Sequence, residues 1–179
     1  MTKNAQNVFV AAINSDIGRQ LALRYKAAGG HVSGTYRNPE SIAQFQDEDG
    51  IDLLPCDISR SEDIEATAER FAKIGRPWNT FIGAVGQLAP IGPFFETDRE
   101  EWAESVAVNS MNQLKLLHAI YPYRCQEGIL KVAFLVGGGI NNAFTNYSAY
   151  CVSKLLLIKM CELLDDEYPN VHAIAIGTG

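Results

Sequence analysis

The amino-acid sequence predicts a three-layer α/β domain in which a parallel sheet of about six strands is doubly wound, with helices on both faces. Short apolar runs alternate with segments of helical spacing along the 179 residues, which is typical of repeated strand–helix–strand units. The apolar runs are nearly continuous, as expected for strands buried on both faces. A chain of this length fits one domain, so we expect residues 1–179 to form a single domain.

Turn and stop signals mark the elements in the first half of the chain. The first apolar run ends in the polar turn Asn14-Ser15-Asp16, and the helical spacing after it stops at Gly29-Gly30, a common C-terminal signal. Glu62 and Asp63 fall in the first turn of a later helix, where the macrodipole favours acids. The predicted elements are strand 8–13, helix 17–28, strand 31–35, short helix 39–46, strand 51–54 and helix 61–74.

Similar signals divide the second half of the chain. A loop rich in glycine and proline over residues 86–95 precedes the capping-box sequence Thr97-Asp98-Arg99-Glu100, which predicts the start of a helix. The helical pattern continues from there to about His118. The predicted elements are strand 80–85, helix 97–118, strand 131–136, helix 147–167 and strand 171–176.

Composition excludes several classes of protein. The net charge of -6 leaves no basic surplus to neutralise DNA or RNA, so we expect no nucleic-acid partner. No apolar run approaches the roughly 18 residues of a membrane span, and residues 1–7 do not resemble a signal peptide. The cysteines have no short paired spacing, so we expect reduced thiols, no metal site and a cytoplasmic location; they are Cys56, Cys125, Cys151 and Cys161.

The turn after the first strand is the first candidate for a ligand site, because parallel sheets bind ligands at the carboxyl ends of their strands. A helix begins there, and backbone amides at a helix N-terminus favour a phosphate. Gly18 is the only glycine in the turn, and the Asp16 carboxylate would repel a phosphate unless it turned away. An ordinary turn capped by Asn14 or Asp16 is therefore the alternative.

Two later positions bear on cofactor preference. No acid ends the second strand, where a carboxylate would hold a ribose 2′-hydroxyl. Arg37 stands there instead, and an arginine suits a 2′-phosphate, although a solvated loop cation is the alternative. Asp57, just past the third strand, is a candidate for contact with an adenine edge or for a helix cap.

Tyr150 and Lys154 are the main catalytic candidates. Their spacing places both side chains on one face of a predicted helix. A nearby ammonium group favours the phenolate, so we expect Lys154 to lower the pKa of Tyr150 and make it an acid-base for a carbonyl oxygen. Chance alone predicts about 0.3 Tyr–Lys pairs at this spacing in a chain of this composition, so the spacing by itself is weak evidence. The interpretation depends on the position of the pair after the fifth strand, at the edge of the sheet where a ligand is expected.

Several motifs in the right order resemble the short-chain dehydrogenase/reductase family, whose NAD(P)-binding domain is a Rossmann fold. The resemblance covers essentially the whole chain. The matching segments are Asn14-Ser15-Asp16-Ile17-Gly18-Arg19, Cys56-Asp57-Ile58, Gly83-Ala84-Val85-Gly86, Glu101-Trp102 with Val108-Asn109, Tyr150-Cys151-Val152-Ser153-Lys154 and Val171 to Gly177.

The resemblance implies a role for each matching residue. Tyr150 would be the acid-base, Lys154 would lower its pKa and bind the nicotinamide ribose, and Asn109 would position a lysine-linked water. A mid-helix amide bonded to a neighbouring backbone is the alternative for Asn109. The cofactor would be NADP(H) rather than NAD(H), held by Asn14, Ser15, Ile17, Gly18, Arg37, Asp57, Ile58, Ala84, Val85, Gly86, Lys154 and Gly177.

The chain departs from the family pattern in three places. Ala12 and Asp16 replace two glycines of the phosphate motif, and Gly137 stands where the family has its catalytic serine. Residues of the following loop are candidates to replace that hydroxyl: Ser148, which is equally a helix cap, Thr145, Asn141 and Asn142. The sequence ends at Gly179, so we expect most of the family's substrate lid and its last strand to be lacking, and the sixth strand to be a sheet edge.

These observations leave three hypotheses. The first is an NADP(H)-dependent oxidoreductase for a carbonyl or alcohol substrate, with Tyr150, Lys154 and Asn109 as its catalytic set. The second is a catalytically impaired relative that senses a cofactor or binds proteins, and the third is another nucleotide binder such as a flavin protein. Long apolar stripes on the helices over about 102–118 and 147–167 indicate a second buried face. The resemblance then implies homodimers or homotetramers through those helices.

Overall fold

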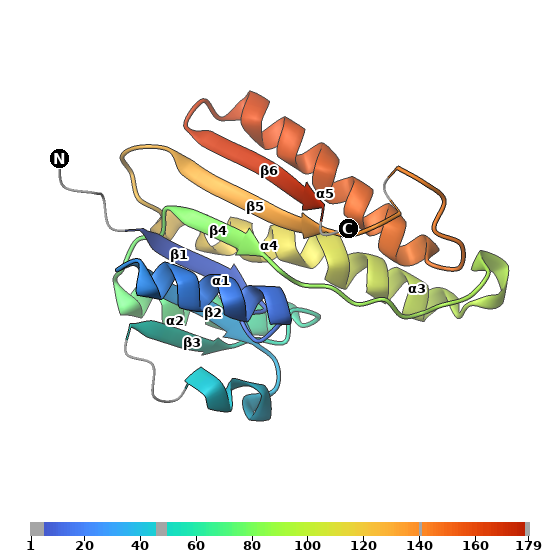
Figure 1. Cartoon of the computed structure of the whole chain (residues 1–179), viewed down its shortest axis with the longest axis horizontal. Coiled ribbons are helices and arrows are strands. Elements are labelled where there is room, and N and C mark those ends of the chain that lie inside the picture. Colours follow the sequence, from blue (N-terminus) through green and yellow to red (C-terminus); the bar gives the residue numbers. More distant parts are fainter. Residues whose placement is uncertain (1–5, 46–49, 140, 178–179) are drawn as a thin grey trace.

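Six parallel strands in the order β3-β2-β1-β4-β5-β6 form a single sheet, which confirms the predicted fold class (Figure 1). The computed structural model describes residues 6–45, 50–139 and 141–177. The strands are β1 (Asn7–Ala11), β2 (His31–Tyr36), β3 (Ile51–Pro55), β4 (Thr80–Gly83), β5 (Leu130–Val136) and β6 (Val171–Gly177). The main helices are α1 (Asp16–Ala27), α2 (Ser61–Ile74), α3 (Arg99–Val106), α4 (Asn112–Ile120) and α5 (Ser148–Glu167).

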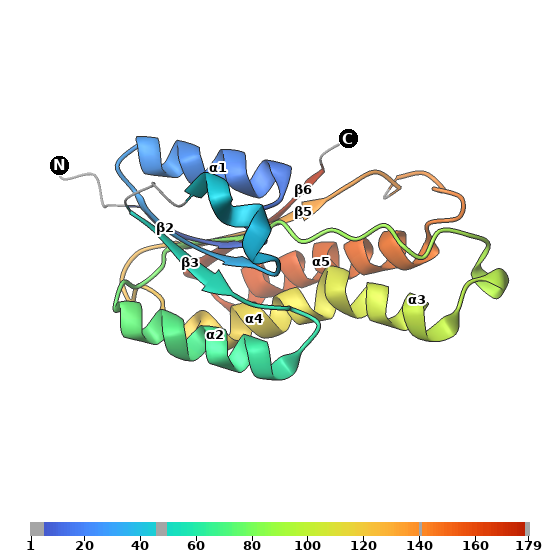
Figure 2. The same ribbon diagram turned by 90° about the horizontal axis from the view of Figure 1, so that it is seen from below.

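Helices cover the two faces of the sheet unequally. Figure 2 shows α1 and the short helix η1 (Pro39–Phe45) on one face, with α2, α3, α4 and α5 on the other. The larger core lies on the second face, where Phe9 packs against Phe71 with ring centroids 5.1 Å apart and Phe81 packs against Phe134 at 5.7 Å. Burial of large aromatic side chains on this scale stabilises the sheet–helix packing.

The first strand ends earlier than predicted. β1 stops at Ala11 because Ala12 adopts a left-handed backbone with φ of 61°, which turns the chain out of the sheet. The N-cap of α1 is Ser15, not Asn14 or Asp16, since its hydroxyl accepts a hydrogen bond from the Gly18 N–H at 3.1 Å. The expected cap residues were wrong by one position, because only Ser15 has the extended backbone of a cap.

The single helix predicted over 97–118 is interrupted. α3 and α4 are joined by a π-helical turn, η3 (Ala107–Met111), which the sequence pattern did not indicate. The N-cap is Asp98 rather than Thr97, because its carboxylate accepts from the N–H groups of Glu100 and Glu101. The Thr97 hydroxyl donates instead to the Phe94 carbonyl at 2.9 Å.

Other predicted elements agree in place and differ in detail. The short helix is a 3₁₀ helix, and its predicted last residue, Gln46, lies outside the described residues, as do Thr178 and Gly179. β6 forms one edge of the sheet, as expected, and its Ile174 and Ile176 side chains are 54% and 41% exposed. Among the described residues, no helix combines the length and apolar character needed to cross a membrane.

Candidate active site

A cavity of about 500 Å³ lies at the carboxyl ends of the strands, where parallel sheets bind ligands. Most of the predicted cofactor residues line it, from four separate loops: Asn14, Ser15, Arg37, Asp57, Ile58, Ala84, Val85 and Gly86. Ala12, Gln87 and Glu104 complete parts of its wall. A larger groove of about 740 Å³ runs between α2 and α4, and none of the predicted site residues lines that groove. The smaller cavity is therefore the candidate site.

The turn at the start of α1 is held by its own side chains. The Ser15 hydroxyl donates to the Ala12 carbonyl at 2.8 Å while it accepts from Gly18, so it closes the turn on itself. Gly18 is buried, and a methyl group on it would overlap the Ala12 carbonyl oxygen. Gly18 thus allows close packing of helix on strand, whereas Ile17 is 40% exposed and does not line the cavity.

Asp16 does not form part of the cavity wall. It is the first residue of α1, its side chain is exposed, and it is absent from the residues that line the cavity. The N-terminus of α1 therefore reaches the cavity through Ser15 and Asn14. The Asn14 side-chain amide donates to the Ser41 hydroxyl at 2.9 Å, which ties this turn to η1.

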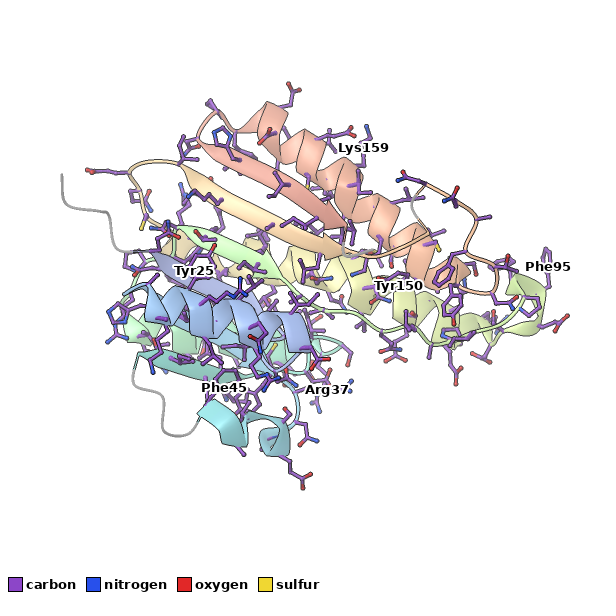
Figure 3. All side chains as sticks on the ribbon, in the orientation of Figure 1. Tyr25, Arg37, Phe45, Phe95, Tyr150 and Lys159 are labelled. Atoms are coloured by element: carbon purple, nitrogen blue, oxygen red, sulfur yellow. The ribbon has the colours of Figure 1, made fainter. Side chains whose placement is uncertain are left out.

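Arg37 and Asp57 differ in how they are engaged. Arg37 is among the residues that line the cavity, and its side chain, labelled in Figure 3, is exposed. One carboxylate oxygen of Asp57 accepts from both the N–H and the hydroxyl of Ser59, at 3.0 and 2.8 Å. Asp57 therefore closes a local turn before α2 and also lines the cavity.

Lys154 lies behind the cavity wall. Its side chain is only 1% exposed, and Nζ donates to the Val85 carbonyl oxygen at 2.9 Å. Burial disfavours the charged form and lowers the pKa of Lys154 to about 8. Val85 itself lines the cavity, so this hydrogen bond connects α5 to the loop after β4 at the candidate site.

The electrostatics at Tyr150 differ from the sequence expectation. Burial raises the pKa of the Tyr150 hydroxyl, the backbone of Gly137 acts in the opposite direction, and the neighbouring Cys151 adds a small increase. The Lys154 ammonium lies 5.5 Å from the Tyr150 ring centroid and is bonded to Val85. The prediction that Lys154 lowers this pKa is therefore wrong for this structure, because the ammonium is directed at a carbonyl rather than at the phenol.

Asn109 lies in the π-helical turn and is fully buried. Its amide makes two hydrogen bonds with the backbone of Gln87, one from the Gln87 N–H and one to the Gln87 carbonyl, both at 2.7 Å. Its main-chain carbonyl accepts from the side chain of Gln113 at 2.6 Å. The alternative of a backbone-bonding amide is thus the one observed, and the bonded backbone belongs to the cavity loop.

Gln87 and Gln113 are site residues that the sequence analysis missed. Gln113 is fully buried in α4, four residues after Asn109. The available signal was a second amide one helical turn after Asn109, which places both side chains on the same helix face. Its Oε1 has no hydrogen-bond partner and lies 2.5 Å from where a side chain on Gly83 would begin, so Gly83 leaves room for it.

The candidates for a replacement hydroxyl are engaged or exposed. The Ser148 hydroxyl accepts from the Trp102 indole N–H at 2.9 Å, which joins α5 to α3. Ser148 is the first residue of α5 and does not cap it. Thr145, Asn141 and Asn142 are exposed in the preceding loop. Gly177 ends β6, paired with Val136, and does not line the cavity.

Comparison with known proteins places this arrangement in a family. Residues 11–177 match the family model described as "Enoyl-(Acyl carrier protein) reductase". The chain belongs to the short-chain dehydrogenase/reductase family. The chain is 26% identical over 176 residues to the uncharacterized oxidoreductase YciK of Escherichia coli, covering 92% of this chain and 69% of that protein. It is 28% identical over 187 residues to the short chain dehydrogenase tazN of Aspergillus terreus, covering 97% of this chain and 41% of that one.

Solved structures share the fold of this chain. A short-chain dehydrogenase from Streptomyces avermitilis superposes with a TM-score of 0.88 at 23% identity, over 99% of this chain and 66% of that one. A short-chain dehydrogenase from Shigella flexneri in complex with NADP gives a TM-score of 0.85 at 21% identity, over 96% and 77%. The chain thus spans between about two fifths and three quarters of the length of these relatives.

Proposed function

We propose that this chain is an oxidoreductase domain that transfers hydride between NADP(H) and a small carbonyl or alcohol substrate. The observation that carries the proposal is the place of Lys154 and Tyr150. They lie one turn apart on α5, and Lys154 is bonded to the carbonyl oxygen of Val85, which lines the cavity at the sheet edge. Family membership supports a nicotinamide dinucleotide as the cofactor.

The donors around the cavity fit such a cofactor. The N-terminus of α1 opens onto it, and a helix N-terminus stabilises the negative charge of a pyrophosphate. Arg37 at the lip suits a 2′-phosphate, because a guanidinium binds phosphate oxygens with two hydrogen bonds. The exposed Asp16 leaves the wall free of its carboxylate. A cavity of about 500 Å³ is also within the range of ligand sites.

Tyr150 is the proposed proton donor. A bound nicotinamide would supply the hydride, as the chemistry of these cofactors requires. The Tyr150 hydroxyl gives its proton to the carbonyl oxygen of the substrate as the carbon accepts the hydride, which leaves an alcohol and a phenolate. Burial raises the pKa of Tyr150, so the hydroxyl carries the proton at neutral pH that this step requires.

Lys154 and Asn109 are proposed to hold the loop after β4 in its conformation. Lys154 holds the Val85 carbonyl and Asn109 holds both backbone groups of Gln87, so the loop after β4 is fixed at three points. Preorganised loops lower the cost of placing a cofactor and a substrate together. The side-chain amide of Asn109 bonds to both backbone groups of Gln87 and to the Ser105 hydroxyl, so its proposed role is to hold the loop.

We further propose that the chain forms homodimers or homotetramers through α4 and α5 in a cytoplasmic setting. Apolar side chains are exposed on α5 and in the π-helical turn that precedes α4: Met111 at 44%, Val152 at 46%, Leu155 at 47% and Leu163 at 41%. Exposed apolar groups on neighbouring helices favour association. All four cysteines are free, which suits a reducing compartment.

The proposal is tested by binding and turnover. Purified protein is titrated with NADPH and NADH while nicotinamide fluorescence is followed, and a panel of ketones and aldehydes is then assayed with the wild type and Tyr150→Phe. We expect NADPH to bind and Tyr150→Phe to lower kcat by about 10²–10⁴-fold, the range for a general acid. If neither cofactor binds at about 1 mM, the top of the usual range of KM values, the proposed oxidoreductase function is contradicted. Binding without any Tyr150-dependent turnover would favour a cofactor sensor.

A further inference from the structure

Gly137 directly follows β5, and its side-chain position is occupied by another residue. A methyl group built on Gly137 would overlap the Tyr150 hydroxyl and would lie 3.1 Å from Cζ and 3.4 Å from Cε1 of the same ring. Real side chains do not approach that closely, so any residue larger than glycine displaces the phenol. The end of the Tyr150 side chain therefore lies where residue 137 would carry a side chain.

The backbone of Gly137 also acts on the phenol. It lowers the pKa of Tyr150, against the larger increase that burial causes. Cys151, next in the chain, adds a further increase, and the Lys154 ammonium is bonded to the Val85 carbonyl oxygen.

The neighbouring glycines show that this relationship is specific to position 137. A methyl group on Gly138 would meet nothing within 4 Å, and its backbone is not left-handed. Gly139 has φ of 86° and lies against Cys151 and Phe144, so its requirement for glycine has a different cause. Two adjacent glycines, Gly137 and Gly138, therefore differ only in whether a side chain would reach Tyr150.

We propose that Gly137 is a positioning residue for Tyr150: the absence of a side chain at position 137 admits the phenol to the place that it occupies against the backbone. The proposal rests on the function proposed above, in which Tyr150 donates the proton. The resemblance by motif predicts that a serine at position 137 would restore a missing hydroxyl and raise activity. The geometry predicts the opposite, because the serine side chain would take the space that the Tyr150 hydroxyl occupies.

The first experiment follows Tyr150 without turnover. Protein labelled with ¹³C at tyrosine Cζ is titrated with base in the wild type, Gly137→Ala and Gly138→Ala, with the Tyr150 resonance assigned by its loss in Tyr150→Phe. We expect Gly137→Ala to move this resonance and to shift its titration midpoint, because the displaced phenol leaves the surroundings that set its pKa. Gly138→Ala is expected to leave both unchanged. An unchanged resonance and midpoint in Gly137→Ala would overturn the proposal.

The second experiment measures rate and stability in the full chain. We expect kcat to fall about 10- to 100-fold in Gly137→Ala and Gly137→Ser, with the Kd for NADPH unchanged, because a small displacement of the proton donor costs about that much in rate. A rise in kcat in Gly137→Ser would refute it. If the protein reduces none of the test compounds while the Tyr150 resonance responds to Gly137→Ala alone, the positioning is supported and the proposed activity is contradicted.

A stability cycle keeps the test valid if Gly137→Ala unfolds the protein. The midpoint of urea unfolding is compared for Gly137→Ala in the wild type and in Tyr150→Ala, where the ring is gone. We expect Gly137→Ala to lower the midpoint in the wild type and to have little effect in Tyr150→Ala, because two residues in contact do not act independently. Equal losses in both backgrounds would show that the glycine serves the backbone and not Tyr150.

Discussion

The Lys154 ammonium donates to the Val85 carbonyl oxygen at 2.9 Å from a side chain that is almost fully buried. A buried charge with a single carbonyl partner is unfavourable, which is why burial lowers the pKa of Lys154 to about 8. Burial of Lys154 thus lowers the stability of the folded protein. In return, its hydrogen bond to Val85 holds the cavity loop against α5.

The stability of the protein is expected to depend on this group between pH 8 and 10.5. The folded pKa lies below the unfolded one, so the penalty is fully present below about pH 8 and is relieved as the pH rises. Relative to Lys154→Met, we expect the wild type to gain up to about 3 kcal/mol over that range, since one pH unit corresponds to 1.36 kcal/mol. Urea unfolding of both proteins from pH 7 to 10.5 measures the difference.

The comparison with Lys154→Met isolates the lysine. Burial raises the pKa values of Cys56, Cys161 and Tyr150, so these groups destabilise the folded state as the pH rises. Their contribution is common to both proteins and cancels in the difference. A difference that stays constant with pH would show that Lys154 titrates at its ordinary pKa.

Asn109→Leu is expected to loosen the cavity loop. The substitution removes the two hydrogen bonds between the Asn109 side chain and Gln87. The N–H and the carbonyl of Gln87 then lose these bonds. We expect the free energy of unfolding to fall by about 2–4 kcal/mol, as for two lost buried hydrogen bonds, and NADPH to bind more weakly. Ser110→Ala is the matched control, because the Ser110 hydroxyl bonds only to the Val106 carbonyl within the same helix. Equal effects of the two substitutions on NADPH binding would contradict the clamp on Gln87.

Ala12→Gly is expected to stabilise the protein. Ala12 has φ of 61°, a conformation that glycine adopts without the steric penalty of a side chain. We expect the free energy of unfolding to rise by about 1 kcal/mol, and NADPH to bind more tightly because Ala12 lines the cavity. Ala28→Gly is the control: Ala28 has φ of -81°, so glycine there is expected to destabilise. A loss of stability in Ala12→Gly would show that the methyl group is favourable where it stands.

Arg37→Ala is expected to weaken NADPH more than NADH. Arg37 lies exposed at the cavity lip, and a lost contact between a guanidinium and a phosphate costs about 1.5–3 kcal/mol, or roughly tenfold to 100-fold in Kd. Titration with each cofactor gives the ratio of the two dissociation constants. Arg99→Ala, which alters an exposed arginine paired with Glu100 on α3, is expected to leave both unchanged. An equal loss for both cofactors would refute a 2′-phosphate role for Arg37.

The sequence determined the architecture and the candidates, because both depend on local patterns. The period and order of the apolar runs predicted the six strands and the helices between them. The predicted end of β1 was too late, because Ala12 adopts a left-handed backbone that few residues other than glycine adopt. Eight of the residues that line the cavity were predicted because they follow strands, and all parallel strands end at the same edge.

What only the tertiary structure decided is how those side chains are used. The π-helical turn, the clamp of Asn109 on Gln87 and the direction of the Lys154 ammonium depend on contacts between segments far apart in the chain. The Tyr150–Lys154 spacing indicated one shared helix face, but burial sets the phenol's pKa and the ammonium faces Val85. The family pattern likewise predicted a serine at position 137, and Gly137 was interpreted as its loss. In the folded protein the Tyr150 hydroxyl occupies the place where a side chain on residue 137 would lie, and only the three-dimensional packing shows this.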